Sequence, residues 1–88
     1  MPDSRETARR IEEILRRNLE ATEVAVEDQS HLHAGHRQAR GGGHFSVVVR
    51  SARFEGLAPL ARQRLVIEAV GGMMDREIHA LSMRCLVP

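Results

Sequence analysis

The sequence contains neither tryptophan nor tyrosine, and Phe45 and Phe54 are its only phenylalanines. A hydrophobic core must therefore be built mainly from Leu, Ile, Val, Met and Ala side chains. The same shortage leaves few aromatic rings on which nucleic-acid bases could stack. Because 88 residues can bury only one small core, we expect residues 1–88 to form a single domain.

Cysteine is almost absent, since Cys85 is the only one in the sequence. An internal disulfide is therefore excluded, and no apolar segment followed by small residues suggests a secretion signal. No run approaches the roughly 20 apolar residues that a membrane-spanning helix needs. These absences predict a cytoplasmic protein without a membrane partner.

Lysine is also absent, so all thirteen basic residues are arginine, and they nearly balance twelve acidic residues. The resulting formal charge of +1 provides no general attraction to nucleic acid or membranes. The sequence also lacks a nucleophile beside a base, a convincing pair of carboxylates and a phosphate-binding glycine motif. We therefore expect no enzymatic activity.

The spacing of apolar residues predicts an α+β fold with the order αββααβ. Steps of three and four residues predict helices over residues 4–19 and 59–70, the first begun by Asp3 and Glu6 in a capping-box pattern. We expect Leu60 on the apolar face of the second helix and left-handed glycines at Gly71 and Gly72 to end it. Alternation predicts strands over 22–27, 45–50 and 78–86, with a short helix or turn over 73–77. Such elements should form a three-stranded sheet with the helices on one face.

The most unusual segment joins the first two predicted strands and reads HLHAGHRQARGGGHF, from His31 to Phe45. It contains four of the five histidines and a run of three glycines. At about fifteen residues it is much longer than an ordinary hairpin loop, which favours a functional role. The fifth histidine, His79, lies in the last predicted strand, and we expect the fold to bring it beside this segment.

Six patches in consistent order resemble the BolA family along almost the whole chain. They are 26–30 (VEDQS), 33–36 (HAGH), 44–45 (HF), 49–56 (VRSARFEG), 62–66 (RQRLV) and 78–82 (IHALS). The resemblance implies a fold similar to the type II KH domain. It also implies pairing with a monothiol glutaredoxin, with a shared [2Fe-2S] cluster and glutathione supplied by that partner, in iron-sulfur trafficking or in iron and stress regulation. The chain alone should be a monomer or a weak homodimer.

The residues themselves are compatible with a shared cluster. Imidazole can replace cysteine at one iron of a [2Fe-2S] centre, so a protein with one cysteine could complete a cluster whose other ligands come from a partner. His79 matches the family pattern Ile-His-Ala-Leu and is the first candidate ligand, followed by His33 and His36 in the loop. His44 matches the family's His-Phe pair, and by alternation with Phe45 it should face away from the core, either lining the site or bonding a neighbour.

Two other functions stay open from the sequence. The loop histidines together with His44 could hold zinc alone, although a glycine-flanked loop makes a poor structural zinc site. Alternatively, the KH-like fold and the arginines Arg62 and Arg64 could bind nucleic acid in transcription regulation, as has been linked to bacterial BolA proteins. That segment lacks a Gly-x-x-Gly loop, however, and Gln63 replaces the histidine of the family's Arg-His-Arg. Cys85 is expected to be a buried or interface thiol.

Overall fold

The structure is a computed structural model and describes residues 4–30 and 43–88. Within these ranges the chain forms two α-helices, three strands and two short 3-10 helices. In chain order they are α1 (Ser4–Asn18), β1 (Glu23–Asp28), β2 (Gly43–Arg50), η2 (Ala52–Phe54), α2 (Pro59–Ala69), η3 (Gly71–Met73) and β3 (Ile78–Leu86).

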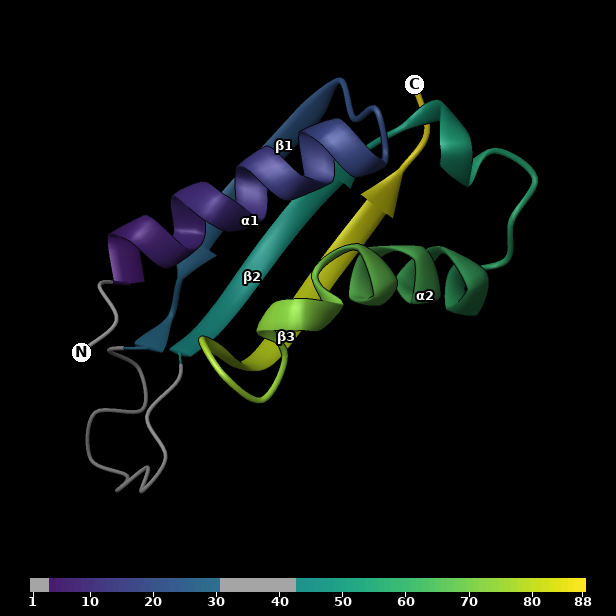
Figure 1. Cartoon of the computed structure of the whole chain (residues 1–88). Helices are drawn as coiled ribbons and strands as arrows, with labels where there is room; N and C mark the ends of the chain where they lie inside the picture. Colours follow the sequence, from purple (N-terminus) through teal and green to yellow (C-terminus); the bar gives the residue numbers. More distant parts are fainter. Residues whose placement is uncertain (1–3, 31–42) are drawn as a thin grey trace.

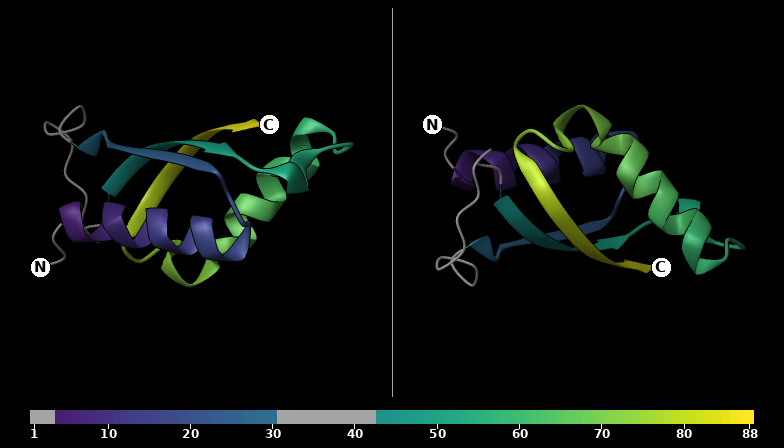
Figure 2. Two further views of the ribbon diagram at one scale, coloured as in Figure 1. Left: turned by 90° about the horizontal axis from the view of Figure 1, so that it is seen from above. Right: turned by 90° about the horizontal axis from the view of Figure 1, so that it is seen from below.

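The three strands form one mixed sheet in the order β1-β2-β3. β1 pairs with β2 in the antiparallel direction, whereas β3 runs parallel to β2 and is reached through α2. Figure 1 shows α1 lying along β1 and β2, with α2 over β3. The two further views in Figure 2 place both helices on the same side of the sheet. The predicted α+β architecture, with helices on one face, is thereby confirmed.

The core lies between the sheet and the helices. Phe45, Val47 and Val49 alternate along β2 and are almost fully buried, because every second residue of a central strand faces the helices. Opposite them, Ile11 and Leu15 of α1 are completely buried. The remaining buried apolar side chains are Leu19, Val24, Phe54, Val66, Val70, Met73 and Ile78.

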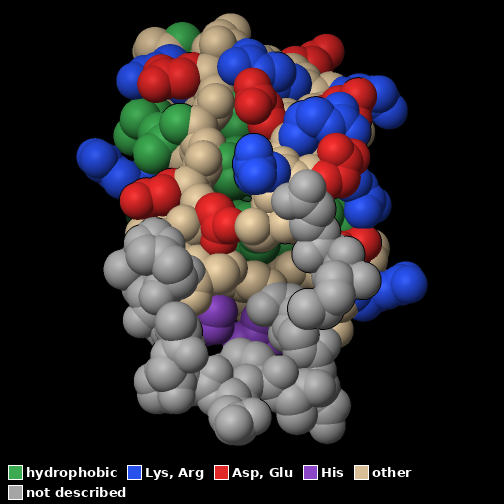
Figure 3. Space-filling view, turned by 90° about the vertical axis from the view of Figure 1, so that its left-hand side faces the viewer, with side chains coloured by type: hydrophobic (Ala, Val, Ile, Leu, Met, Phe, Trp, Pro, Cys, Tyr) green, Lys and Arg blue, Asp and Glu red, His purple; other side chains and the backbone are tan. Residues whose placement is uncertain are grey.

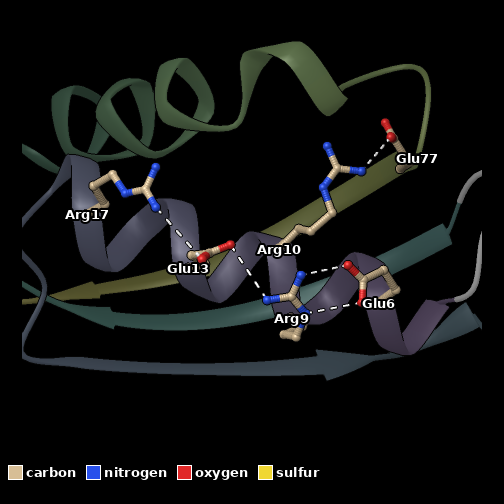
Figure 4. Close-up of polar contacts among 6 residues, drawn as sticks. All are labelled: Glu6, Arg9, Arg10, Glu13, Arg17 and Glu77. Atoms are coloured by element: carbon tan, nitrogen blue, oxygen red, sulfur yellow. Dashed lines mark hydrogen bonds and ion pairs between the residues drawn. The ribbon is translucent and has the colours of Figure 1, made fainter.

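The other side of α1 carries charges that pair along the helix surface. Arg9 bonds Glu6 at 2.7 Å and Arg16 bonds Glu12 at 3.0 Å, both with well-exposed side chains. One pair instead leaves the helix, because Arg10 reaches Glu77, just before β3, at 2.9 Å (Figure 4). The helix predicted over 4–19 is therefore confirmed, and it divides into a buried apolar stripe and a charged, solvated face.

Two local expectations were wrong. Leu60 is 61% exposed rather than part of the core, since the first turn of α2 projects past the sheet. Gly71 and Gly72 end α2 by starting a 3-10 turn, and Gly56 is the glycine with positive φ in the described ranges. The short helix or turn expected over 73–77 is present as a turn over 75–77, which follows the three-residue η3.

Candidate histidine site

His44, the second residue of β2, lies on the face of the sheet opposite the helices. Its neighbour Phe45 is buried beneath α1, so the alternation of the strand directs the His44 side chain to the other face, as predicted. The register places His44 beside Ala80 of β3. The imidazole is therefore attached to the central strand of the sheet, a rigid support.

His79 comes next to His44 through an irregularity in the pairing of β2 with β3. Gly43 is paired with Ile78 and His44 with Ala80, so β3 contributes one extra residue, which is His79. Ile78 is buried while His79 is exposed. Simple alternation over 78–86 would place His79 on the same face as Leu81, and this is wrong at the start of the strand because the bulge resets the phase.

The two imidazoles form a close pair. Their ring centroids are 5.2 Å apart and the rings are tilted by 51°. Figure 3 shows them as adjacent purple side chains, since His44 and His79 are the histidines within residues 4–30 and 43–88. Beside them is a hollow of about 210 Å³ lined by Gln29, His44, Phe45, Ala80, Leu81 and Ser82.

The end of β1 holds the backbone of His44 in place. The His44 N–H donates to Ser30 Oγ at 3.1 Å, and the N–H of Gln29 donates to the His44 carbonyl at 2.7 Å. The Ser30 N–H in turn donates to Asp28 Oδ1 at 2.9 Å. Sequence reasoning gave these three residues no role, although they belong to the segment VEDQS that carries part of the family resemblance.

The other predicted ligands are outside the part of the chain that the structure describes. His33 and His36, like His31, fall in residues 31–42, outside the described ranges. Among the described residues, no group of three or more His, Cys, Asp or Glu side chains is arranged to hold a metal ion. The described part of the chain therefore offers two imidazoles, His44 and His79, as nearby metal-ligand candidates.

The two arginines predicted to bind nucleic acid have different surroundings. Arg62 Nε donates to the Leu57 carbonyl at 2.9 Å and its Nη1 to the Cys85 carbonyl at 3.1 Å. Arg62 thus joins the start of α2 to β3. Arg64 is exposed on α2.

Cys85 is part of the same contact between α2 and β3. Its side chain is half-buried in a pocket of about 150 Å³ with Pro59, Arg62, Gln63 and Met83. Burial raises the pKa of the Cys85 thiol, and the nearby Arg62 guanidinium partly offsets this by lowering the pKa. The thiol is therefore a poor nucleophile at neutral pH, in agreement with the predicted packing role.

The pair of imidazoles is suited to metal chemistry. A neutral imidazole nitrogen is a common ligand of iron and zinc, and two imidazoles can replace two cysteines at one iron of a [2Fe-2S] centre. Both rings lie at one end of the sheet, where His79 is exposed while the Nε2 atom of His44 is buried, so a metal group carried by another molecule could approach His79. With only two nearby ligands in the described residues, other ligands would have to come from residues 31–42 or from a partner.

Comparison with known proteins points to one family. The family described as "BolA-like protein" matches residues 15–88. Among curated proteins, "Protein BOLA1, chloroplastic" from Arabidopsis thaliana is 38% identical over 85 residues, which cover 92% of this chain and 53% of the relative. The "DNA-binding transcriptional regulator BolA" of Haemophilus influenzae is 27% identical over 78 residues, covering 89% of this chain and 74% of that protein.

Solved structures agree with this assignment. The BolA domain of SufE1 from Arabidopsis thaliana superposes with a TM-score of 0.81 at 33% identity, covering 100% of this chain and 96% of that chain. BolA1 from the same plant gives a TM-score of 0.78 at 37% identity, covering 92% and 90%. The mixed three-stranded sheet with helices on one side is therefore the BolA fold.

Two further findings concern the chain as a whole. It spans only 53% of Arabidopsis BOLA1 and 23% of the chloroplastic/mitochondrial SufE-like protein 1 from the same plant. No helix in the described ranges is long and apolar enough to cross a membrane. The relatives include chloroplastic and bacterial proteins, so the cytoplasmic location inferred from the sequence stays a prediction.

Proposed function

Because this chain belongs to the BolA-like protein family, we propose that it is a partner of a monothiol glutaredoxin and supplies histidine ligands to a shared [2Fe-2S] cluster. The observation that carries the proposal is the exposed His79 with the ring of His44 at 5.2 Å. A protein with a single, half-buried cysteine has no thiolate set for a cluster of its own.

The donor set fits a cluster that is completed from two sides. His79 is the first ligand of this chain, and His33 or His36 is the second, with His44 either a ligand or the neighbour that limits how the His79 ring can turn. The glutaredoxin would supply thiolate ligands from its own cysteine and from glutathione. When bound, such a cluster supplies electron-transfer chemistry and transferable iron and sulfur, and imidazole ligation raises its reduction potential.

A titration with cluster-loaded monothiol glutaredoxin tests this function. The wild-type chain is expected to change the visible absorption and circular dichroism of the cluster, because a ligand exchange alters the iron environment. His79→Ala should abolish this change. Arg84→Ala, at an exposed position of β3 that does not line the hollow beside the histidines, is the control and should behave as wild type. An unchanged spectrum with the wild-type chain would defeat the proposal.

A second candidate function is nucleic-acid binding, which is favoured by the names of the bacterial relatives. The regulators of Haemophilus influenzae and Vibrio cholerae are both described as DNA-binding, and the latter is 45% identical to this chain over 49 residues. On this chain the exposed Arg64 is the better phosphate contact, since Arg62 already bonds two backbone carbonyls.

Duplex DNA binding measured over a salt series distinguishes this function. If phosphate contacts contribute, the affinity should fall with increasing salt, and Arg64→Ala should lower both the affinity and the salt slope, the latter by about 1. Arg62→Ala should change the DNA affinity only by weakening the contact between α2 and β3. The free energy of unfolding of this variant would reveal that weakening. Binding that is independent of salt and of both substitutions would rule out this surface.

A further inference from the structure

We propose that Ser30 and Gly43 are positioning residues that hold the His44 imidazole beside His79. The value of this positioning rests on the proposed function, because a cluster would meet two imidazoles in one fixed geometry. The positioning itself involves only described residues, so the separation of the two rings can be tested in the metal-free chain.

Ser30 fixes the backbone of His44 from the side of β1. Its hydroxyl oxygen accepts the His44 N–H at 3.1 Å, where β1 has ended and no strand partner remains for this group. The hydroxyl is itself held, because the Ser30 N–H donates to Asp28 Oδ1 at 2.9 Å. A side chain therefore replaces the next rung of the β1–β2 ladder, and the first residues of β2 stay in register beyond the end of β1.

Gly43 makes this contact possible because it has no side chain. A Cβ atom at this position would lie 2.7 Å from Ser30 Oγ and 2.6 Å from Cε2 of the buried Phe45. Both distances are far below van der Waals contact, so any larger residue would displace Ser30 or the Phe45 ring. The requirement for glycine is thus steric, and it exists where the hydroxyl approaches β2.

The start of β3 holds the same backbone from the other side. The Gly43 N–H donates to the Glu77 carbonyl at 2.9 Å. Two residues after Glu77 comes His79, the extra residue between the pairs Gly43–Ile78 and His44–Ala80. Residues 43 and 44 are therefore bonded on one edge to the residues that follow β1 and on the other edge to the residue that precedes β3. The separation of the two rings depends on the bond to Ser30 and on the bond to Glu77. Of the two, only the bond to Ser30 is made by a side chain and can be removed by a substitution.

The geometric test is the nuclear Overhauser effect between ring protons of His44 and His79 in the metal-free chain. The wild-type chain should show this cross-peak, since the ring centroids are 5.2 Å apart. Ser30→Ala should lose it, whereas Ser30→Thr, which keeps the hydroxyl acceptor, should retain it. Ser46→Ala is the matched control, because Ser46 lies on the same face two residues further along β2.

Gly43→Ala tests the same positioning independently and should also lose the cross-peak. Gly72→Ala is its control and should retain the cross-peak, because a Cβ at position 72 would meet nothing within 4 Å. Amide spectra recorded in parallel show whether each variant is folded. If Ser30→Ala is unfolded, the cross-peak of Gly43→Ala tests the inference in its place. A cross-peak that persists in folded Ser30→Ala and Gly43→Ala would overturn the inference.

The glutaredoxin titration separates this inference from the proposed function. If both hold, Ser30→Ala should weaken the response to the cluster-loaded partner by about 2- to 10-fold, the value of one hydrogen bond, and Ser30→Thr should restore it. A wild-type chain that shows the cross-peak but no spectral response would refute the function and leave the positioning intact. Absence of the cross-peak in the wild-type chain would refute the positioning, whatever the cluster does.

Discussion

Ser51 shows how much of this fold depends on single polar atoms. Its side chain is completely buried, and its hydroxyl donates to the Leu19 carbonyl at 2.6 Å while accepting the Arg53 N–H at 3.0 Å. It thereby joins the chain segment after α1 to the start of η2. Buried polar groups that are paired in this way are costly to leave without a partner.

Replacing Ser51 with alanine should therefore destabilise the protein. The substitution leaves the buried carbonyl of Leu19 and the N–H of Arg53 without this partner, and the expected loss in the free energy of unfolding is about 1–3 kcal/mol. Urea denaturation monitored by far-ultraviolet circular dichroism measures it. Ser46→Ala, on the open face of the sheet, should change the free energy by less than about 0.5 kcal/mol. Equal values for the two variants would contradict this account of Ser51.

Alternation along the strands predicted the side-chain direction of His44 correctly but not that of His79. The direction of His44 follows from the alternation around Phe45, which the structure confirms. The phase of His79 could not be predicted, because the bulge that resets it arises from pairing with Gly43, 36 positions earlier by residue number. Ser30 and Ser51 were missed because the partners of a hydroxyl are set by tertiary contacts.

Among the elements, α1 was the most predictable. Its stripe contains Ile11 and Leu15, both completely buried, and its other side carries acidic residues followed by arginines at four-residue steps. Local spacing determines both features, so the sequence is sufficient. These exposed ion pairs each stabilise the helix by only about 0.2–0.5 kcal/mol, and the buried stripe contributes most of its stability.

α2 was less predictable because its sequence is apolar on more than one side. Val66 of α2 and Val70, directly after the helix, are buried, while Leu60 and Ile67 remain 61% and 43% exposed. Composition alone could not distinguish the inner face from the outer one. The choice is made by the parallel crossover from β2 to β3 and by Arg62, which bonds the backbone at Cys85.

For the whole molecule, the ion pair between Arg10 and Glu77 joins two ends of the chain. The residues are 67 positions apart, and the pair connects α1 to the turn that precedes β3 and His79 (Figure 4). The pKa of Glu77 lies below its usual value of 4.5 because of a backbone hydrogen bond and the bond from Arg10. The ionised carboxylate is therefore favoured in the folded state.

A lowered carboxyl pKa gives a definite pH dependence. The stability that Glu77 contributes should be fully present above about pH 4.5 and should be lost as the pH falls through the lower folded-state value. Glu77→Gln should therefore be less stable than wild type at pH 6, and the two should converge below pH 4.5. Urea unfolding at a series of pH values measures this difference.

Glu68→Gln is the control for the loss of one negative charge, since Glu68 belongs to no ion pair recorded among the described residues. A constant difference between wild type and Glu77→Gln across the pH range would show that the ion pair does not contribute in this way.

The sequence by itself determined the elements, the α+β class and the family, because helices and strands follow from the local spacing of apolar side chains and the family from short motifs in order. The sequence also led us to expect His79 beside the segment from His31 to Phe45. Only the tertiary structure decided that His44 of this segment adjoins it, that Arg62 bonds the backbone of Cys85, and that Ser30 and Gly43 share one contact. These features depend on strand register and on contacts between residues far apart in the chain. Local spacing carries no information on either.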